Sequence, residues 1–269
     1  MITVASLVLY KHAYNDVKKT IDCLLLEKKI SKVVIVDNGS HCAWLSSLKS
    51  TKLNLVALES NDGFGAGHNA TIERFGDEAD FILICNPDIS FEQGEVDKLI
   101  DFSSQSNIAL SAPKILYPDG NIQHSCKLLP TPTQLFARRF LARFCFKQNS
   151  VYELVEADYS KSFFAPSMSG CFMLISRKAI AVTKGFDTQY FMYLEDVDFS
   201  RRVSSAGLNV RYCPNSYVIH ESQRRSYTSY KFLIYHIKSA VRYFNKWGWF
   251  IDKERDILNR KCLIELPRV

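Results

Sequence analysis

The sequence predicts an α/β fold: one domain with a mostly parallel central sheet flanked by helices. Short β-branched runs alternate with helical patterns over the first hundred residues, which is typical of βαβ units. A chain of 269 residues is long enough to bury one large core. Its 47% hydrophobic and 23% charged residues are typical of a globular protein and argue against disorder.

Four strands and four helices are expected in the first half. The strands are 3–10, 32–37, 53–58 and 81–86, and the helices are 15–28, 41–50, 68–76 and 92–104. Runs such as KVVIVD are apolar at almost every position, as in strands covered on both faces. Because ligands of such sheets bind at the carboxyl ends of the strands, the polar residues that follow each strand are candidates for a site.

The second half is less regular. Helices are expected at 134–147, 194–207 and 227–247, and strands at 169–176, 208–213 and 217–220. The last helix is amphipathic, with Lys231, Lys238, Arg242 and Lys246 on one side and apolar residues on another. A second basic and aromatic segment spans 136–147.

Charge is divided unevenly along the chain. Residues 1–125 carry 11 Lys and Arg against 16 Asp and Glu, whereas residues 126–269 carry 23 against 12. The basic second half indicates either an anionic partner or a solvated basic surface. No apolar run reaches the roughly 18 residues of a membrane-spanning helix, and the N-terminus lacks a signal-peptide pattern, so a cytoplasmic protein is expected.

Eight cysteines are scattered along the chain, and no pair has CxxC spacing. Several lie inside apolar runs, as in FILICNPD. This pattern predicts reduced, buried thiols rather than zinc ligands or disulfides.

The segment NDGFGAGHN follows the third predicted strand and contains Gly63, Gly65 and Gly67. It differs from a dinucleotide-binding fingerprint, which needs GxGxxG directly after the first strand. Two interpretations stay open from the local sequence: a turn that redirects the chain, or a backbone that lies against a flat or anionic ligand.

Carboxylates occur at two notable places. In ICNPDIS, Pro87 fixes a turn after a buried strand, so that Asp88 could hold Mg²⁺ or Mn²⁺ with a diphosphate, or simply form an Asx-turn or helix cap. In YFMYLEDVDFSRR, Glu195, Asp196 and Asp198 begin a helix after an aromatic run. They are either acids favoured by the helix dipole or a general base beside an apolar wall.

The segment VIHESQRRS ends a predicted strand with His220. A histidine there is either an ordinary core or surface residue or, beside a metal and a diphosphate, a ligand. Arg224 and Arg225 could hold phosphate oxygens.

Taken in order, VDNGS, NDGFGAGHN, CNPDI, SGCFMLISRKAI, GFDTQYFMYLEDVDFSRRV and VIHE resemble the inverting family 2 glycosyltransferases with the GT-A fold. The rhamnosyltransferase-like subgroup, which acts on polyprenyl-diphosphate sugars, is the most similar, over about residues 3–226. The resemblance implies a GT-A domain with a Rossmann-like sheet over 1–226, with a nucleotide-sugar half (1–125) and an acceptor-side half (126–226). Residues 227–269 would form a C-terminal amphipathic helical extension of the same domain.

The resemblance also implies roles for individual residues. The catalytic base would be Asp196, with Glu195 beside it, and Mg²⁺ or Mn²⁺ would be held by Asp88 and His220. Asn86 stands where the family motif has its first Asp. The donor would be bound by Asp37, Asn38, Asn61, Gly63, Phe64, Gly65, Gly67, Asn69, Asn86 and Asp88. The acceptor or a phosphate would be contacted by Gly170, Asp198, Arg224 and Arg225.

The implied activity is inverting, metal-dependent transfer of a hexose in cell-surface polysaccharide synthesis, such as that of O-antigen. The expected donor is dTDP-rhamnose and the expected acceptor a polyprenyl-diphosphate-linked glycan. Transfer of galactofuranose, galactose or glucose from a UDP donor stays open, and an oligomer is compatible with the sequence. The lipid acceptor and the basic, aromatic segments predict peripheral binding to an anionic inner membrane face, with a solvated basic helix face as the alternative.

Other function classes are less favoured. A nucleotidylyltransferase would need a glycine- and basic-rich loop after the first strand, where this chain has YKHAYND. A nucleic-acid-binding module conflicts with the acidic first half. A non-catalytic sugar-nucleotide-binding protein would have no need to keep Asp88, Asp196 and His220.

Overall fold

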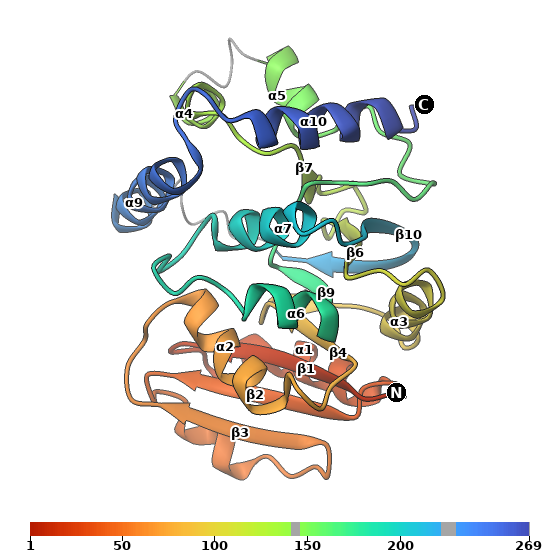
Figure 1. Cartoon of the computed structure of the whole chain (residues 1–269). Coiled ribbons are helices and arrows are strands. Elements are labelled where there is room, and N and C mark those ends of the chain that lie inside the picture. Colours follow the sequence, from red (N-terminus) through yellow and green to blue (C-terminus); the bar gives the residue numbers. More distant parts are fainter. Residues whose placement is uncertain (141–145, 222–229, 269) are drawn as a thin grey trace.

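The computed structural model describes residues 1–140, 146–221 and 230–268, with the side chains of 137–140 and 146–148 left out (Figure 1). In this part of the chain, eight strands form one sheet in the order β3-β2-β1-β4-β9-β6-β10-β5, and β7 and β8 form a separate small sheet.

The first half consists of parallel strands joined by helical connections, as the sequence predicts. Its elements are β1 (Thr3–Leu9), α1 (Tyr14–Leu26), β2 (Lys32–Asn38), η1 (Ala43–Ser47), β3 (Leu53–Leu58), α2 (Phe64–Phe75) and β4 (Phe81–Cys85). β1 pairs in parallel with both β2 and β4, and β2 pairs in parallel with β3. Two expectations are corrected: the helix expected at 41–50 is only a short 3₁₀ helix, and α2 begins four residues before the expected 68.

The rest of the chain adds strands that run in both directions. Its elements are β5 (Ile89–Ser90), α3 (Glu95–Gln105), β6 (Leu110–Leu116), β7 (Cys126–Lys127), α4 (Pro132–Phe140), α5 (Phe146–Tyr152), β8 (Ser167–Met168), β9 (Phe172–Ser176), α6 (Arg177–Thr183), α7 (Glu195–Ser205), β10 (Val210–His220), α9 (Tyr230–Trp247) and α10 (Lys253–Glu265). β9 runs antiparallel between β4 and β6, whereas β6 and β10 are parallel.

A proline explains one strand that the sequence pattern misses. Pro113 lies inside β6 and has no N–H to donate to a neighbouring strand. The register between β6 and β10 shifts between Cys213 and Tyr217, next to the Pro113–Cys213 pair. Such an irregularity is where a sheet tolerates a proline. The two strands expected at 208–213 and 217–220 are parts of one strand, β10, on either side of it.

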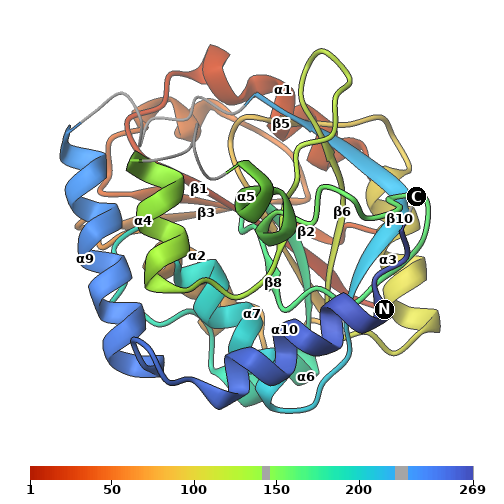
Figure 2. The same ribbon diagram turned by 90° about the horizontal axis from the view of Figure 1, so that it is seen from above.

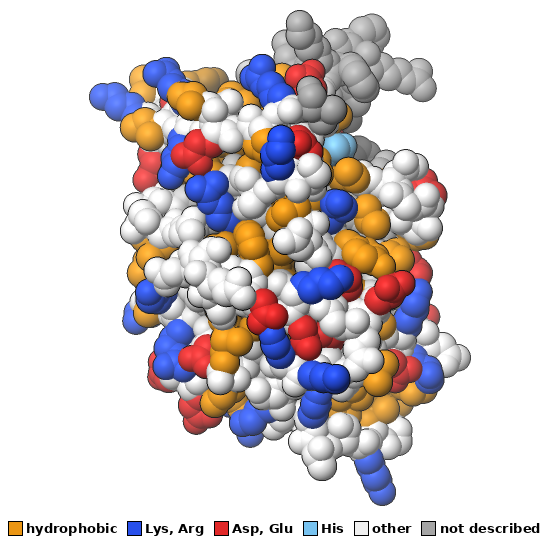
Figure 3. All heavy atoms as spheres, turned by 90° about the vertical axis from the view of Figure 1, so that its right-hand side faces the viewer, with side chains coloured by type: hydrophobic (Ala, Val, Ile, Leu, Met, Phe, Trp, Pro, Cys, Tyr) orange, Lys and Arg blue, Asp and Glu red, His pale blue; other side chains and the backbone are white. Residues whose placement is uncertain are grey.

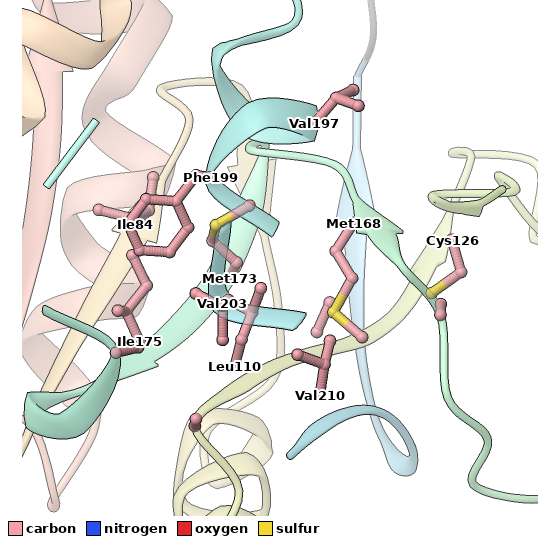
Figure 4. Close-up of a cluster of buried hydrophobic side chains, with 14 of the residues drawn as sticks. Ile84, Leu110, Cys126, Met168, Met173, Ile175, Val197, Phe199, Val203 and Val210 are labelled. Carbon is pink, nitrogen blue, oxygen red and sulfur yellow. The ribbon is translucent and has the colours of Figure 1, made fainter. Parts of the chain in front are cut away.

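Both faces of the sheet are covered, so alternate residues of a strand enter different cores. In β2, Val34 and Val36 belong to the core that also contains residues of α2, α6 and α7, whereas Val33 and Ile35 belong to the core that contains residues of α1, η1 and α3. In Figure 4, Phe199 and Val203 of α7 lie among side chains of β4, β6 and β9, including Ile84, Leu110 and Met173. Helix α7 is therefore fixed to the sheet along its apolar side.

The two C-terminal helices lie on the far side of α7 from the parallel strands. Helix α10 crosses one end of the molecule, and α9 lies along one side (Figure 2). Arg201 of α7 is 1% exposed and forms two hydrogen bonds with Asp252, at 2.7 and 2.6 Å, and one with Tyr243. No helix among the described residues is long and apolar enough to cross a membrane. The seven described cysteines are all free, and all but Cys23 are buried, as expected; Cys145 lies outside the described residues.

Candidate functional site

The glycines of NDGFGAGHN lie against protein. Gly63 has φ 107°, and a Cβ there would lie 2.1 Å from the carbonyl oxygen of Phe191. A Cβ on Gly65 would lie 2.8 Å from Phe186 Cβ, and one on Gly67 would lie 2.7 Å from Val8 Cγ1. The absence of side chains therefore lets α2 begin directly against β1 and the segment 186–191, which leads into α7.

Polar residues at the ends of β2 and β3 tie this loop to the sheet. Asn38 donates its amide hydrogens to Asn61 Oδ1 and to the carbonyl oxygen of Gly63, both at 3.0 Å, while Asn38 Oδ1 is buried without a hydrogen-bond partner in the described chain. Asp37 accepts the N–H groups of His41 and Cys42. These residues, which were expected to bind the nucleotide sugar, are thus grouped at one edge of the sheet. The buried side-chain oxygen of Asn38 can accept a hydrogen bond there.

Asn69 lies inside α2, and its side chain contacts the backbone at Phe186 in the segment that leads into α7. Its amide donates to the carbonyl oxygen of Phe186 and accepts the N–H of Phe186, each at 2.8 Å. Both polar groups of the side chain are thus used by the backbone before α7, so Asn69 positions that backbone.

Two residues in an unusual conformation precede the acidic motif. Tyr193 has φ 73° and Leu194 has φ 65°, both in the left-handed region that disfavours side chains. Helix α9 supports this turn: Tyr235 packs on Phe191, and Ser239 donates to the carbonyl oxygen of Met192. Strain of this kind persists where surrounding contacts hold it, and it occurs often at functional sites.

Asp196 is the most accessible of the three acidic residues at the start of α7. Its Oδ2 accepts the N–H of Gly170 and its Oδ1 accepts the N–H of Val197, both at 2.8 Å. A Cβ on Gly170 would lie 3.2 Å from both Asp196 Cβ and Phe64 Cε1. The candidate base, the glycine loop and the residues just before β9 therefore meet at one point.

The two adjacent carboxyl groups have different surroundings. Burial, and then the charge of Asp196, raise the pKa of Glu195 well above its usual range, and Glu195 Oε2 has no hydrogen-bond partner in the described chain. Burial also raises the pKa of Asp196, opposed by the N–H groups of Gly170 and Val197 and by the positive charge of Lys127. The surroundings of Glu195 thus favour its neutral form, whereas the two N–H groups and the charge of Lys127 favour the ionised form of Asp196 against the effect of burial.

Asp198 is fully enclosed, at 0% exposure. Its oxygens accept from Arg202 Nε and Trp247 Nε1, and Lys246 Nζ lies 2.8 Å from Oδ1. Both of its oxygens are held by residues of α7 and α9, so Asp198 positions α7 against α9.

Asp88 and His220 lie together at the far edge of the sheet. His220 Nε2 is 3.2 Å from Asp88 Oδ1, and His220 Nδ1 is hydrogen-bonded to Gln123 Oε1 at 2.9 Å. Burial disfavours the charged forms, but the contact and mutual charge outweigh it: the pKa of Asp88 is lowered and that of His220 is raised to about 10. Asp88 Oδ1 is buried and accepts no well-aligned hydrogen bond in the described chain.

These two residues could hold a divalent cation that shares its other ligands with a diphosphate, and the cation would then replace the proton that lies between His220 Nε2 and Asp88 Oδ1. In the described ranges, no group of three or more His, Cys, Asp and Glu side chains is arranged to hold a metal by itself. Mg²⁺ and Mn²⁺ are commonly held by one or two protein ligands together with substrate phosphates, and a metal-bound histidine donates its second ring N–H to a neighbour such as Gln123.

The two parts of the site are connected through the backbone. The N–H of Asn86 donates to the carbonyl oxygen of Cys171, the residue after Gly170, at 2.8 Å. The sequence pattern did not indicate Gln123, Cys171 or Lys127, since each acquires its place only through tertiary contacts. Arg224 and Arg225 lie outside the described residues.

Curated relatives resemble the chain over most of its length. It is 28% identical over 215 residues to an N-acetylglucosaminyl-diphospho-decaprenol L-rhamnosyltransferase of Mycobacterium tuberculosis, covering 73% of this chain and 68% of the relative. It is 27% identical over 249 residues to the Escherichia coli K12 rhamnosyltransferase WbbL, covering 88% and 91%. No family model matches the chain.

Solved structures share the fold. A crystal structure of Staphylococcus aureus TarS 1-349 aligns with a TM-score of 0.62 at 14% identity, covering 98% of this chain and 71% of TarS. The Pyrobaculum calidifontis mannosyltransferase PcManGT with GDP-Man and Mn²⁺ aligns at 0.59 and 13% identity, over 89% of this chain and 64% of that one. GalNAc-T7 with UDP, GalNAc and Mn²⁺ aligns with a TM-score of 0.60 at 13% identity. This alignment covers 81% of this chain and 42% of GalNAc-T7.

Together these similarities confirm both the GT-A type fold and the resemblance to rhamnosyltransferases that the motifs predict.

Proposed function

We propose that this protein is an inverting glycosyltransferase of cell-surface glycan synthesis that uses Asp196 as its base. The proposed donor is dTDP-rhamnose and the proposed acceptor a hydroxyl of a polyprenyl-diphosphate-linked glycan, by analogy with the relatives' names. The observation that carries the proposal is the meeting of Asp196, Gly170 and Phe64, where a partly exposed carboxylate adjoins the proposed donor loop.

The proposed reaction needs one base and no covalent intermediate. Asp196 takes the proton of the acceptor hydroxyl while that oxygen forms a bond to the anomeric carbon. The bond between this carbon and the donor diphosphate breaks on the opposite side, and its electron pair leaves with the diphosphate. General base catalysis of this kind contributes roughly 10²–10⁴ in rate.

The hydrogen bonds to Asp196 hold its carboxylate in place, and burial favours the neutral form of Glu195 beside it. Asp88 and His220 would hold Mg²⁺ or Mn²⁺, which would neutralise charge on the departing diphosphate. Two structures with the same fold contain Mn²⁺ with a nucleotide or nucleotide sugar, which supports the same class of cofactor here.

The proposed donor site is the sheet edge formed by Asp37, Asn38 and Asn61, with the loop at Gly63 beside it. The buried side-chain oxygen of Asn38 and the carboxylate of Asp37 can accept hydrogen bonds from the N–H of a pyrimidine base or the hydroxyl groups of a ribose. Because thymine and uracil present similar groups, UDP sugars are the second candidates. A thermal-shift panel of dTDP and UDP sugars, each with and without Mn²⁺, would separate them.

Substitution of the two acidic residues tests the base. Asp196→Asn is expected to lower transfer by about 10²–10⁴ while donor binding stays within a few-fold. Glu195→Gln is the matched control, because glutamine resembles the neutral acid already present, and it is expected to keep transfer within several-fold. Near wild-type transfer by Asp196→Asn would show that another residue is the base.

A further inference from the structure

We propose that the outer face of α10 and the turn before it bind the surface of an anionic bilayer. The residues of this "α10 surface" are Phe250, Ile251, Lys253, Ile257, Arg260 and Ile264. The inference rests on the proposed function in one respect: a lipid-linked acceptor gives the protein a reason to be at a membrane.

The α10 surface exposes large apolar side chains. Phe250 is 81% exposed, Ile251 84%, Ile257 66% and Ile264 76%, among the highest values for large hydrophobic residues in the described chain. Ile257 and Ile264 are two turns apart and line one open hollow together with Lys253 and Arg260. Apolar side chains with cations beside them are typical of helices that lie in a membrane interface.

The opposite face of α10 is firmly held, so the exposed face is a fixed feature of the fold. Leu258 and Cys262 are buried, and Asn259 forms two hydrogen bonds with the backbone of Leu129. Asp252, which caps the helix, is paired with Arg201 of α7. The apolar outer residues cannot turn inward without breaking these contacts.

The basic row of α9, expected from sequence to face a membrane, is partly committed to the protein. Lys246 lies 2.8 Å from carboxylate oxygens of both Asp187 and Asp198, and Trp247 donates to Asp198. The other basic segment, 136–147, has no described side chains beyond residue 136. The α10 surface is thus the better candidate.

Charge favours a bilayer over a second copy of this chain. Asp256 and Glu265 border the hollow, but they lie near Arg255 and Arg211, which belong to the protein itself. Lys253 and Arg260 form no ion pair with the described chain. A two-fold dimer would bring two copies of the same lysine- and arginine-bearing surface together, whereas anionic headgroups would complement these cations.

Figure 3 shows the side of the molecule that lies on the right in Figure 1. There acidic and basic side chains are interspersed, and hydrophobic side chains occur in small groups among them. A mixed surface of this kind is typical of a face in contact with water.

The test is co-sedimentation of the whole chain with vesicles. Binding is expected to vesicles of phosphatidylglycerol and phosphatidylethanolamine, to weaken at high salt, and to be weaker to phosphatidylcholine alone. The double variant Phe250→Ser/Ile251→Ser is expected to bind about tenfold or more weakly. The control Leu26→Ser/Val182→Ser, which removes apolar residues exposed at 60% and 51% on other helices, is expected to bind as the wild type.

Failure of the wild type to bind anionic vesicles at low salt would overturn the inference, as would equal binding by the double variant. A concentration-dependent dimer in ultracentrifugation that is lost in the double variant would assign the surface to a second copy instead. Transfer to a short-chain, water-soluble acceptor separates the two proposals. The double variant is expected to keep that activity, whereas absence of transfer by a wild type that binds vesicles would contradict the proposed function alone.

Discussion

The sequence alone indicated that the acidic residues at the start of α7 are candidates for catalysis. The difference in pKa shift between Glu195 and Asp196, however, comes from the residues around them. Glu195 and Asp196 are adjacent in sequence, yet burial raises the pKa of Glu195 well above its usual range, whereas the carboxylate of Asp196 is held by two backbone N–H groups. Lys127 contributes a positive charge from β7, a strand too short to be predicted. Such long-range electrostatic partners carry no local signal in the sequence.

The charge of Lys127 leads to a prediction about pH. Asp196 must be ionised to accept a proton, and Lys127 lowers its pKa. Lys127→Met is therefore expected to raise that pKa, so the acidic limb of kcat/KM moves to higher pH. Profiles of kcat/KM against pH measure this, with Lys161→Met as a control in an exposed ion pair. An unmoved limb, or one displaced to lower pH, would contradict the role given to Lys127.

At the scale of elements, the parallel βαβ order was predictable because strands buried on both faces leave long apolar runs. The start of α2 was not, because glycines normally disfavour a helix. They are tolerated here because β1 and the segment 186–191 leave no space for side chains. The local sequence left open whether these glycines form a turn or lie against a ligand, and the fold shows that they pack against β1 and the segment 186–191.

Substitution at Gly63 tests this packing. Gly63→Ala combines a left-handed φ with a Cβ placed 2.1 Å from the Phe191 oxygen, so it is expected to lower the free energy of unfolding by roughly 2–4 kcal/mol. Gly94→Ala is the matched control, with φ 97° but nothing within 4 Å, and about 1–2 kcal/mol is expected. Urea denaturation of both variants measures the difference. Equal losses would mean that Gly63 is needed only for its backbone conformation.

Over the whole molecule, the C-terminal helices are joined to the helix that carries the proposed base. Arg201 and Asp252 form a buried ion pair between α7 and the start of α10, and Asp198 links α7 to α9. The sequence placed Arg201 on a helix and predicted a helical extension over 227–269, but within it the residue pattern indicated a helix only at 227–247. The charged, weakly amphipathic sequence of α10 hides the few buried positions that attach it.

Breaking the buried pair is expected to be costly. Arg201→Met leaves Asp252 enclosed without its main partner, so roughly 3–5 kcal/mol of stability should be lost. Arg211→Met removes a half-exposed pair with Glu265, where about 0–1 kcal/mol is expected. Thermal or urea unfolding of the two variants compares them. Similar losses would show that the link between α7 and α10 contributes little.

The pairing of β5 with β10 has a consequence for how the protein is made. Ile89 lies opposite His220 in that pairing, which brings the two proposed metal ligands together from distant parts of the chain. A ribosome releases Asp88 long before His220, and β10 can join the sheet only after most of the domain exists. The proposed metal site is therefore among the last features to form during synthesis, and a partly made chain cannot hold the ion in this way.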